Sequence, residues 1–314
     1  MKRIIVGLLS LFVIASMTGC NFEQTEDIYI VYTNDVGGEV NGVIGYAGVK
    51  GYTDALKAEN KYVSLVDSGD FLEGDIAINS NGEAIVQIMN AVGYDVVAAG
   101  NQEFCLGLDA FSNAIKNSRF PIISCNIKYI GSGSNPLKGL KPYVIKRYGW
   151  TKIAFIGVIT PETILKEGKS SYEAVMKDGE PLFYFYEDNE GEALYEQVQK
   201  TVDKVRKKVD YVIVLAHLGS NSTLEGFNSY DLINHTNGID VVIDGHSHTV
   251  ISGEAVNNKD GEMVVLTSTG EKIQNIGVLD IHPDHSFTTV LYPSVYDIDN
   301  DILSLIDSIS AKTN

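Results

Sequence analysis

The sequence has few cysteines and few basic residues. Only three of its 314 residues are cysteine, too few for the disulfide framework of a small secreted protein. Lys and Arg number 24 against 41 Asp and Glu, a formal net charge of −17, so no nucleic-acid partner is expected. The apolar run of residues 4–16 is too short to span a bilayer comfortably. The hydrophobic content of 44% is instead typical of a globular chain.

The first 27 residues have the pattern of an export signal followed by a tether. A basic head precedes the apolar run, which ends in Ser16-Met17-Thr18-Gly19-Cys20. This ending resembles a bacterial lipobox, which implies cleavage before Cys20 and lipidation of its thiol; a plain signal peptide is the alternative. We therefore expect a lipoprotein leader at 1–20, a tether at 21–27, and a mature protein outside the cytoplasm, anchored to the cell membrane.

Apolar, β-branched segments alternate with segments of helical spacing in the rest of the chain. Such runs predict buried strands. The runs lie at residues 28–32, 62–66, 95–99, 211–215 and 241–243. No repeat or linker stands out after residue 27. The pattern predicts one layered α/β domain over residues 28–314, whose sites form at the carboxyl ends of the strands.

The polar residues just past these strands form a mixed nitrogen and oxygen donor set. They are Asp35, Asp70, Asn101, His217, His246 and His248. Borderline divalent metals such as Zn, Mn or Fe prefer such ligands, whereas Ca and Mg prefer oxygen alone. Two ions that share a carboxylate can activate water and polarise a phosphoryl group. The sequence therefore predicts a site for one or two divalent metal ions.

The ordered series of strand-end segments resembles the calcineurin-like metallophosphoesterases, and among them the N-terminal catalytic domain of the 5′-nucleotidase family. The segments are Thr33-Asn34-Asp35, Asp67-Ser68-Gly69-Asp70, Gly100-Asn101-Gln102-Glu103-Phe104, Ala216-His217-Leu218-Gly219 and Gly245-His246-Ser247-His248-Thr249. The resemblance implies a metallophosphoesterase sandwich of two mixed β-sheets flanked by helices. It also implies hydrolysis of phosphorylated small molecules, nucleotides among them.

The resemblance assigns roles to the six candidate ligands. It implies that Asp70 bridges two ions. Asn101, His217 and His246 would complete one metal site, and Asp35 and His248 would serve the other. Full nucleotidases of this family continue into a C-terminal domain that stacks the base, and we expect no counterpart of it here.

Three positions depart from the family pattern. Gly37 stands where the family has a histidine ligand, Gln102 stands at the catalytic histidine, and Cys105 replaces the Asp that orients this histidine. Gln donates a hydrogen bond but carries no charge and supplies no proton near neutral pH. These departures predict a phosphoester hydrolase of reduced activity. The alternative is an inactive pseudoenzyme that retains one metal and acts as a surface binding protein.

Several residues outside the ligand set also carry expectations. Glu103 is expected to brace its loop by hydrogen bonds, and Asp67 either supports a metal-bound histidine or caps its turn. The aromatic segment Phe183-Tyr184-Phe185-Tyr186 is expected to pack in the core or form a lid, with base stacking as the alternative. Cys105 and Cys125 are expected to remain free thiols.

Overall fold

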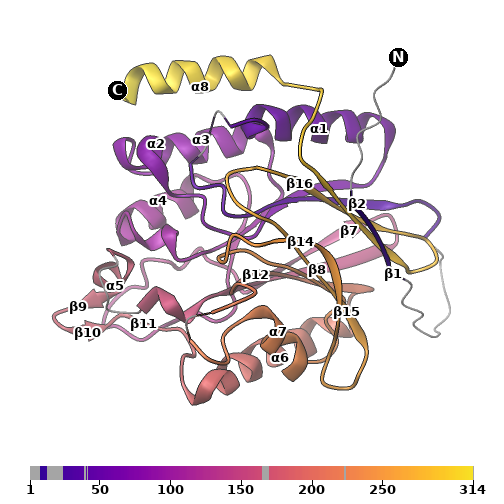
Figure 1. Ribbon diagram of the computed structural model, residues 1–314. Helices are drawn as coiled ribbons and strands as arrows, with labels where there is room; N and C mark the ends of the chain where they lie inside the picture. The colour runs from indigo at the N-terminus through magenta and orange to yellow at the C-terminus, as the bar shows by residue number, and fades with distance from the viewer. Residues whose placement is uncertain are drawn as a thin grey trace.

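The computed structural model describes residues 8–12, 24–38, 40, 42–164, 170–222 and 224–313. Two large mixed sheets pack face to face, and helices cover their outer faces (Figure 1). The predicted fold class, an α/β sandwich of two mixed sheets flanked by helices, is confirmed.

The first sheet has seven strands. In spatial order they are β1 (Leu8–Phe12), β17 (Phe287–Tyr292), β16 (Ile276–Ile281), β2 (Ile28–Thr33), β3 (Val63–Asp67), β4 (Val96–Ala98) and β5 (Ile122–Ile123). Strands β2 to β5 run parallel, whereas β16 is antiparallel to both β2 and β17. The carboxyl ends of β2, β3 and β4 therefore meet at one edge.

The second sheet has six strands. Their order is β14 (Val250–Asn257), β15 (Met263–Thr269), β13 (Val241–Ile243), β12 (Tyr211–His217), β8 (Thr151–Ile159) and β7 (Tyr143–Tyr148). The four inner strands are parallel and the two outer ones antiparallel. Every residue of β12 is buried, because helices cover one face and the first sheet the other. Two small ribbons pair β6 (Lys128–Tyr129) with β11 (Phe183–Tyr184) and β9 (Met176–Lys177) with β10 (Glu180–Pro181).

Helices lie on the two outer faces. On the first sheet's side are α1 (Gly45–Glu59), α2 (Gly74–Asn79), α3 (Glu83–Val92), α4 (Leu108–Asn117) and α8 (Asn300–Thr313), while α6 (Glu192–Arg206) and α7 (Ser229–His235) cover the second sheet (Figure 1). Helix α5 (Ser170–Ala174) and three 3₁₀ turns, η1 (Gln102–Phe104), η2 (Pro161–Ile164) and η3 (Asn189–Gly191), lie in the connections. Among the described residues, no helix combines the length and apolar character needed to cross a membrane.

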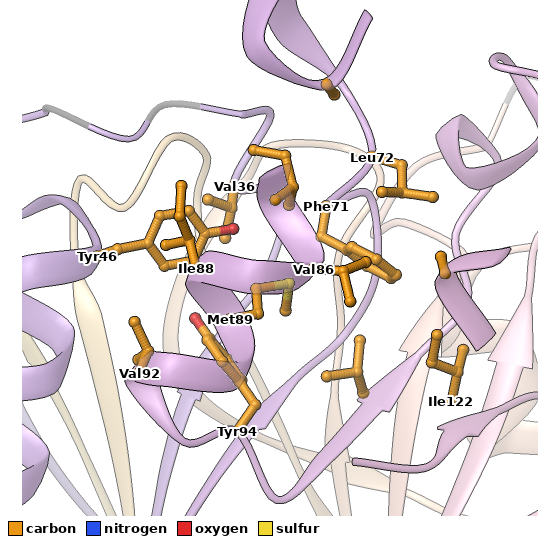
Figure 2. Packing of buried hydrophobic residues seen from close by; sticks show 14 of the residues in the cluster. Val36, Tyr46, Phe71, Leu72, Val86, Ile88, Met89, Val92, Tyr94 and Ile122 are labelled. Carbon is orange, nitrogen blue, oxygen red and sulfur yellow. The ribbon is translucent and has the colours of Figure 1, made fainter. Parts of the chain in front are cut away.

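Hydrophobic packing fixes the loops that follow the first strands. Val36 and Phe71, each adjacent to a candidate ligand, are fully buried in the cluster under α1 and α3. Figure 2 shows both side chains in this cluster with Tyr46, Met89 and other residues of the helices. Burying such side chains is worth roughly 1.5–3 kcal/mol each, so the apolar core holds Asp35 and Asp70 in place.

The predicted leader only partly overlaps the described residues. Leu8–Phe12 forms the edge strand β1, which pairs with β17. Cys20 and its neighbours lie outside the described residues, so the leader at 1–20, the tether at 21–27 and the domain boundary at residue 28 stay predictions.

Candidate metal centre

The six candidate ligands lie at the carboxyl ends of five parallel strands. Asp35, Asp70 and Asn101 follow β2, β3 and β4 of the first sheet. His217 ends β12 of the second sheet, and His246 and His248 follow β13. The loops are tied across the two sheets, since the Ser68 hydroxyl donates a 2.8 Å hydrogen bond to the Ile243 carbonyl. The strand ends that sequence analysis singled out therefore do converge.

Asp70, His217 and His246 form the centre of this arrangement. One candidate ligand atom from each lies within 4.8 Å of the other two. His217 Nε2 is 3.1 Å from Asp70 Oδ2, and both side chains are almost fully buried. The other ring nitrogen, Nδ1, lies 2.8 Å from the Ser68 carbonyl, to which it donates its proton. Nε2 is therefore the atom that His217 presents to the centre.

Buried polar atoms without partners show that these residues fit a cation. Among the described residues, Asn101 Oδ1 is buried with no hydrogen-bond partner, and the buried His217 Nε2 faces only the carboxylates of Asp70 and Asp35. Such orphaned atoms cost free energy unless something binds them. Gly100 leaves the space free, because a Cβ there would lie 2.2 Å from Asp70 Oδ1 and 2.9 Å from His217 Nε2. This donor set of carboxylate, amide oxygen and imidazole suits a borderline divalent metal.

Asp35 and His248 lie beside this centre. His248 Nε2 is 3.5 Å from Asp35 Oδ1, which is 3.8 Å from His217 Nε2. The Asp35 carboxylate also accepts the backbone N–H of His246 at 2.9 and 3.0 Å. His248 is half exposed, and its Nδ1 is 3.3 Å from Glu271 Oε2. This second half of the site is more open than the first.

The site loops are held in a rare backbone conformation. Asp35, Asp70, His246 and His248 all have positive φ, between 49° and 73°. Non-glycine residues seldom adopt this region, and such strain persists only where the surrounding structure enforces it. Strain at four of six candidate ligands is what a site built for a bound group would show.

Glu103 braces the loop that carries Asp70, as predicted. Its buried carboxylate accepts backbone N–H groups of Asp70, Phe71, Leu72 and Gly100. Asp67 caps its own turn, because its Oδ1 accepts the Gly69 N–H at 2.8 Å and its Oδ2 the Thr33 hydroxyl at 2.5 Å. Neither carboxylate is one of the converging ligands.

Charge and burial compete within the centre. Burial alone would lower the pKa of His217, but the carboxylates of Asp70 and Asp35 raise it to about 10. Burial acts to raise the pKa of Asp70, yet His217 lowers it below its usual value. At Asp35 the effect of burial exceeds that of the neighbouring His217, so its pKa is raised. The bare site therefore favours positive charge beside its carboxylates, which a divalent cation supplies.

The three departures have distinct surroundings. A Cβ on Gly37 would lie 3.4 Å from Glu73 Oε2, so a carboxylate borders the place of the absent imidazole. The Gln102 backbone N–H donates to Asp70 Oδ1 at 2.8 Å. The Cys105 thiol donates to Gln102 Oε1 at 2.9 Å. Gln102 and Cys105 thus form a neutral hydrogen-bonded pair next to the centre.

Sequence analysis missed two acidic residues of the site. Glu162 lies in η2, just past β8, and its Oε2 is 3.1 Å from His246 Nε2. Glu271 contacts His248. Glu162 carries the same signal as the six candidates, a polar residue shortly after a strand.

The aromatic segment and the cysteines follow their expectations. Phe183 and Phe185 are buried and pack edge to face with Phe104, as a core cluster does. Tyr184 and Tyr186 lie against each other with ring centroids 4.5 Å apart. The Cys105 thiol donates to Gln102, and Cys125 is a buried free thiol.

The chain is similar to a known protein family and to known proteins. A family model described as "Bacterial capsule synthesis protein PGA_cap" matches residues 56–275. The chain is 30% identical over 265 residues to a snake venom 5′-nucleotidase of Gloydius brevicauda. That alignment covers 79% of this chain and 41% of the relative, so the chain spans less than half the relative's length.

Solved structures share the fold. The 5′-nucleotidase precursor of Thermus thermophilus has a TM-score of 0.75 at 23% identity, over 91% of this chain and 59% of that one. The calcineurin-like phosphoesterase YfkN of Bacillus subtilis has a TM-score of 0.73 at 22% identity, over 92% and 98% of the two chains. At these identities the likeness establishes the two-sheet architecture.

Asp67 makes the stability of the protein depend on pH. Burial raises its pKa from 3.8 to about 8, so the folded protein retains a proton that the unfolded chain releases. Stability is therefore lost as pH rises from about 4 toward 8, at most by about 1.4 kcal/mol per pH unit for one such group. We expect Asp67→Asn, which stays neutral, to gain stability relative to the wild type over this range. Urea unfolding of both proteins between pH 5 and 8 measures this, and parallel curves would contradict it.

Proposed function

The chain belongs to the family described as "Bacterial capsule synthesis protein PGA_cap", whose model covers most of it, and we propose from that premise that it hydrolyses phosphoesters with bound divalent metal ions. Its resemblance to the catalytic domain of 5′-nucleotidases and calcineurin-like phosphoesterases is confirmed by its relatives and by the fold. The observation that carries the proposal is the convergence of Asp70, His217 and His246 from three strand ends of two sheets.

The proposed ligands divide into two groups. Asp70, Asn101, His217 and His246 would hold one ion, and Asp35 and His248, with Asp70 shared, would hold a second. Zn, Mn or Fe fits this donor set best. When bound, such ions activate water and polarise the phosphoryl group. The protein orients the ligands: the Ser68 carbonyl fixes the His217 ring, and Glu103 fixes the Asp70 loop.

Gln102 is the residue we propose to contact the substrate. The Cys105 thiol binds its amide oxygen, so its NH₂ group is the end left to donate to a phosphoryl oxygen. A neutral amide stabilises developing negative charge less than a cationic imidazole would, and it cannot protonate the leaving group. The proposed activity is therefore lower than that of a site with histidine at this position.

The substrate is proposed to be a phosphorylated small molecule, with nucleotides the leading candidates. The support is the name of the snake venom relative, a 5′-nucleotidase, of which this chain matches 41%. The net charge of −17 disfavours a nucleic acid. Tyr184 and Tyr186 lie against each other with ring centroids 4.5 Å apart. This pair is the proposed place for a nucleotide base to stack, as the alternative to a purely structural role.

A second candidate function is a pseudoenzyme that keeps one metal and binds a ligand at the cell surface. The neutral Gln102–Cys105 pair and the missing imidazole at Gly37 favour it. Both functions retain the Asp70–His217–His246 centre. They differ in whether the protein hydrolyses a phosphoester.

The location is proposed to be extracytoplasmic, with a lipid anchor at Cys20. The support is the sequence alone: a basic head, an apolar run and a lipobox-like ending. A lipidated Cys20 would lie four residues from Gln24, whose side-chain amide donates to the Ile281 carbonyl. The anchor and the domain would then be separated by at most roughly 14 Å of extended chain.

Metal-dependent turnover tests the function directly. With Mn²⁺ or Zn²⁺ added, the wild type is expected to hydrolyse an aryl phosphate and a nucleoside monophosphate. Asp70→Ala should reduce turnover to background and lower the metal content measured by elemental analysis, because it removes the carboxylate at the centre. Asp75→Ala, which removes an exposed acid in the first turn of α2, is the control. A wild type no faster than Asp70→Ala would exclude catalysis and leave the pseudoenzyme.

Restoring the missing histidine and its partner tests the reduced activity. A positioned acid–base group contributes on the order of 10²–10⁴ in rate. We expect Gln102→His with Cys105→Asp to raise kcat at least about 10-fold, and Cys105→Asp alone to give no gain. Steady-state kinetics on the aryl phosphate decide the matter. A double variant no faster than the wild type would contradict the role assigned to position 102.

Substitution of Cys20 tests the anchor. In the bacterial host, Cys20→Ala should move the protein from the membrane fraction to a soluble extracytoplasmic fraction, because the thiol that carries the lipid is lost. Fractionation and the mass of the N-terminal peptide measure this. Identical membrane retention of both proteins would argue against lipidation.

A further inference from the structure

Glu162 contacts the imidazole of His246, one of the candidate metal ligands. It is buried in η2, only 4% exposed. Its Oε2 lies 3.1 Å from His246 Nε2, and its Oε1 accepts the Ser222 hydroxyl at 2.9 Å. Both carboxylate oxygens are thus engaged, so the side chain is fixed in one orientation.

This contact engages the Nε2 atom of His246 and leaves its Nδ1 atom for other partners. A carboxylate that accepts Nε2–H would place the lone pair of the ring on Nδ1. His217 has the opposite arrangement, since its Nδ1–H donates to the Ser68 carbonyl and its Nε2 faces Asp70. Each imidazole therefore has one nitrogen held by an acceptor and the other left for the centre.

Other contacts leave His246 dependent on this carboxylate. Its backbone is held at a φ of 73° by the Asp35 carboxylate, which accepts its N–H. The side chain is partly exposed, in contrast to the fully buried His217. Packing alone therefore constrains the His246 ring less than it constrains His217, and the bond to Glu162 supplies the missing restraint.

We propose that Glu162 is a positioning residue that selects the Nε2–H tautomer of His246 and aims Nδ1 at the metal centre. The proposal rests on the function proposed above. Carboxylates that hold metal-binding histidines in this way raise the basicity of the ligand and fix the ring, and losing them typically costs 10–100-fold in metal affinity. Because Glu162 follows β8, which is parallel to β12, it adds a sixth parallel strand to those whose ends form the site.

Two substitutions test the proposal by separating charge from hydrogen bonding. Glu162→Gln keeps the shape but removes the charge, and Glu162→Leu removes the acceptor as well. Glu73→Gln is the matched control, because it removes another carboxylate near Asp70 that has no contact with His246 among the described residues. Thermal unfolding of each metal-free protein identifies any variant that fails to fold.

The first readout is the ¹⁵N chemical shift of the His246 ring in metal-free protein. We expect the Nε2–H tautomer in the wild type and in Glu73→Gln, and a mixture of tautomers in Glu162→Leu. A folded Glu162→Leu protein with the wild-type tautomer would overturn the proposal. This measurement needs no metal, so it stands even if the wild type shows no phosphoester hydrolysis.

The second readout is Mn²⁺ affinity, followed by electron paramagnetic resonance. Glu162→Leu should weaken binding about 10–100-fold and Glu162→Gln by less, since Gln still accepts a hydrogen bond. Unchanged affinity in folded Glu162→Leu would refute a role in positioning. A wild type that binds no Mn²⁺ would instead refute the metal-dependent function, and the two failures are thereby distinguished.

Discussion

The buried contact between Asp70 and His217 is the interaction on which the rest of the site depends. It joins the carboxyl end of β3 in one sheet to the carboxyl end of β12 in the other, across 3.1 Å. In a low-dielectric interior, the remaining polar atoms of such a pair need hydrogen-bond partners of their own. Ser68 binds the far nitrogen of the imidazole, and the Gln102 N–H binds the second carboxylate oxygen. Backbone groups from two loops, those after β3 and β4, are thereby ordered around this pair.

The apolar core positions the residues of the polar centre. Val36 and Phe71 pack beneath α1 and α3, and each lies next to a residue with positive φ that points into the site. Hydrophobic burial supplies the free energy that keeps Asp35 and Asp70 in this strained conformation. Glu103 then pairs the backbone groups that the sharp turn after β3 leaves without partners.

The departures from the family pattern are locally consistent rather than disruptive. A histidine and its orienting acid form a charged pair, whereas Gln102 and Cys105 form a neutral one joined by a thiol–amide hydrogen bond. At Gly37, the carboxylate of Glu73 borders the space an imidazole would need. The departure at Gly37 and the departures at Gln102 and Cys105 thus lie in different surroundings, the first beside a carboxylate and the others in a neutral pair.

The sequence by itself determined the α/β class, the strand-end placement of the six candidate ligands and the bracing role of Glu103, because buried strands and the residues that follow them leave a local pattern. It did not reveal that Glu162 contacts His246, since the two residues are 84 positions apart in the chain. Only the tertiary structure decided which ligand atoms converge, because that depends on how two sheets pack. Nor could local pattern show that Asp35 binds the His246 backbone from 211 residues away, which depends on the same packing.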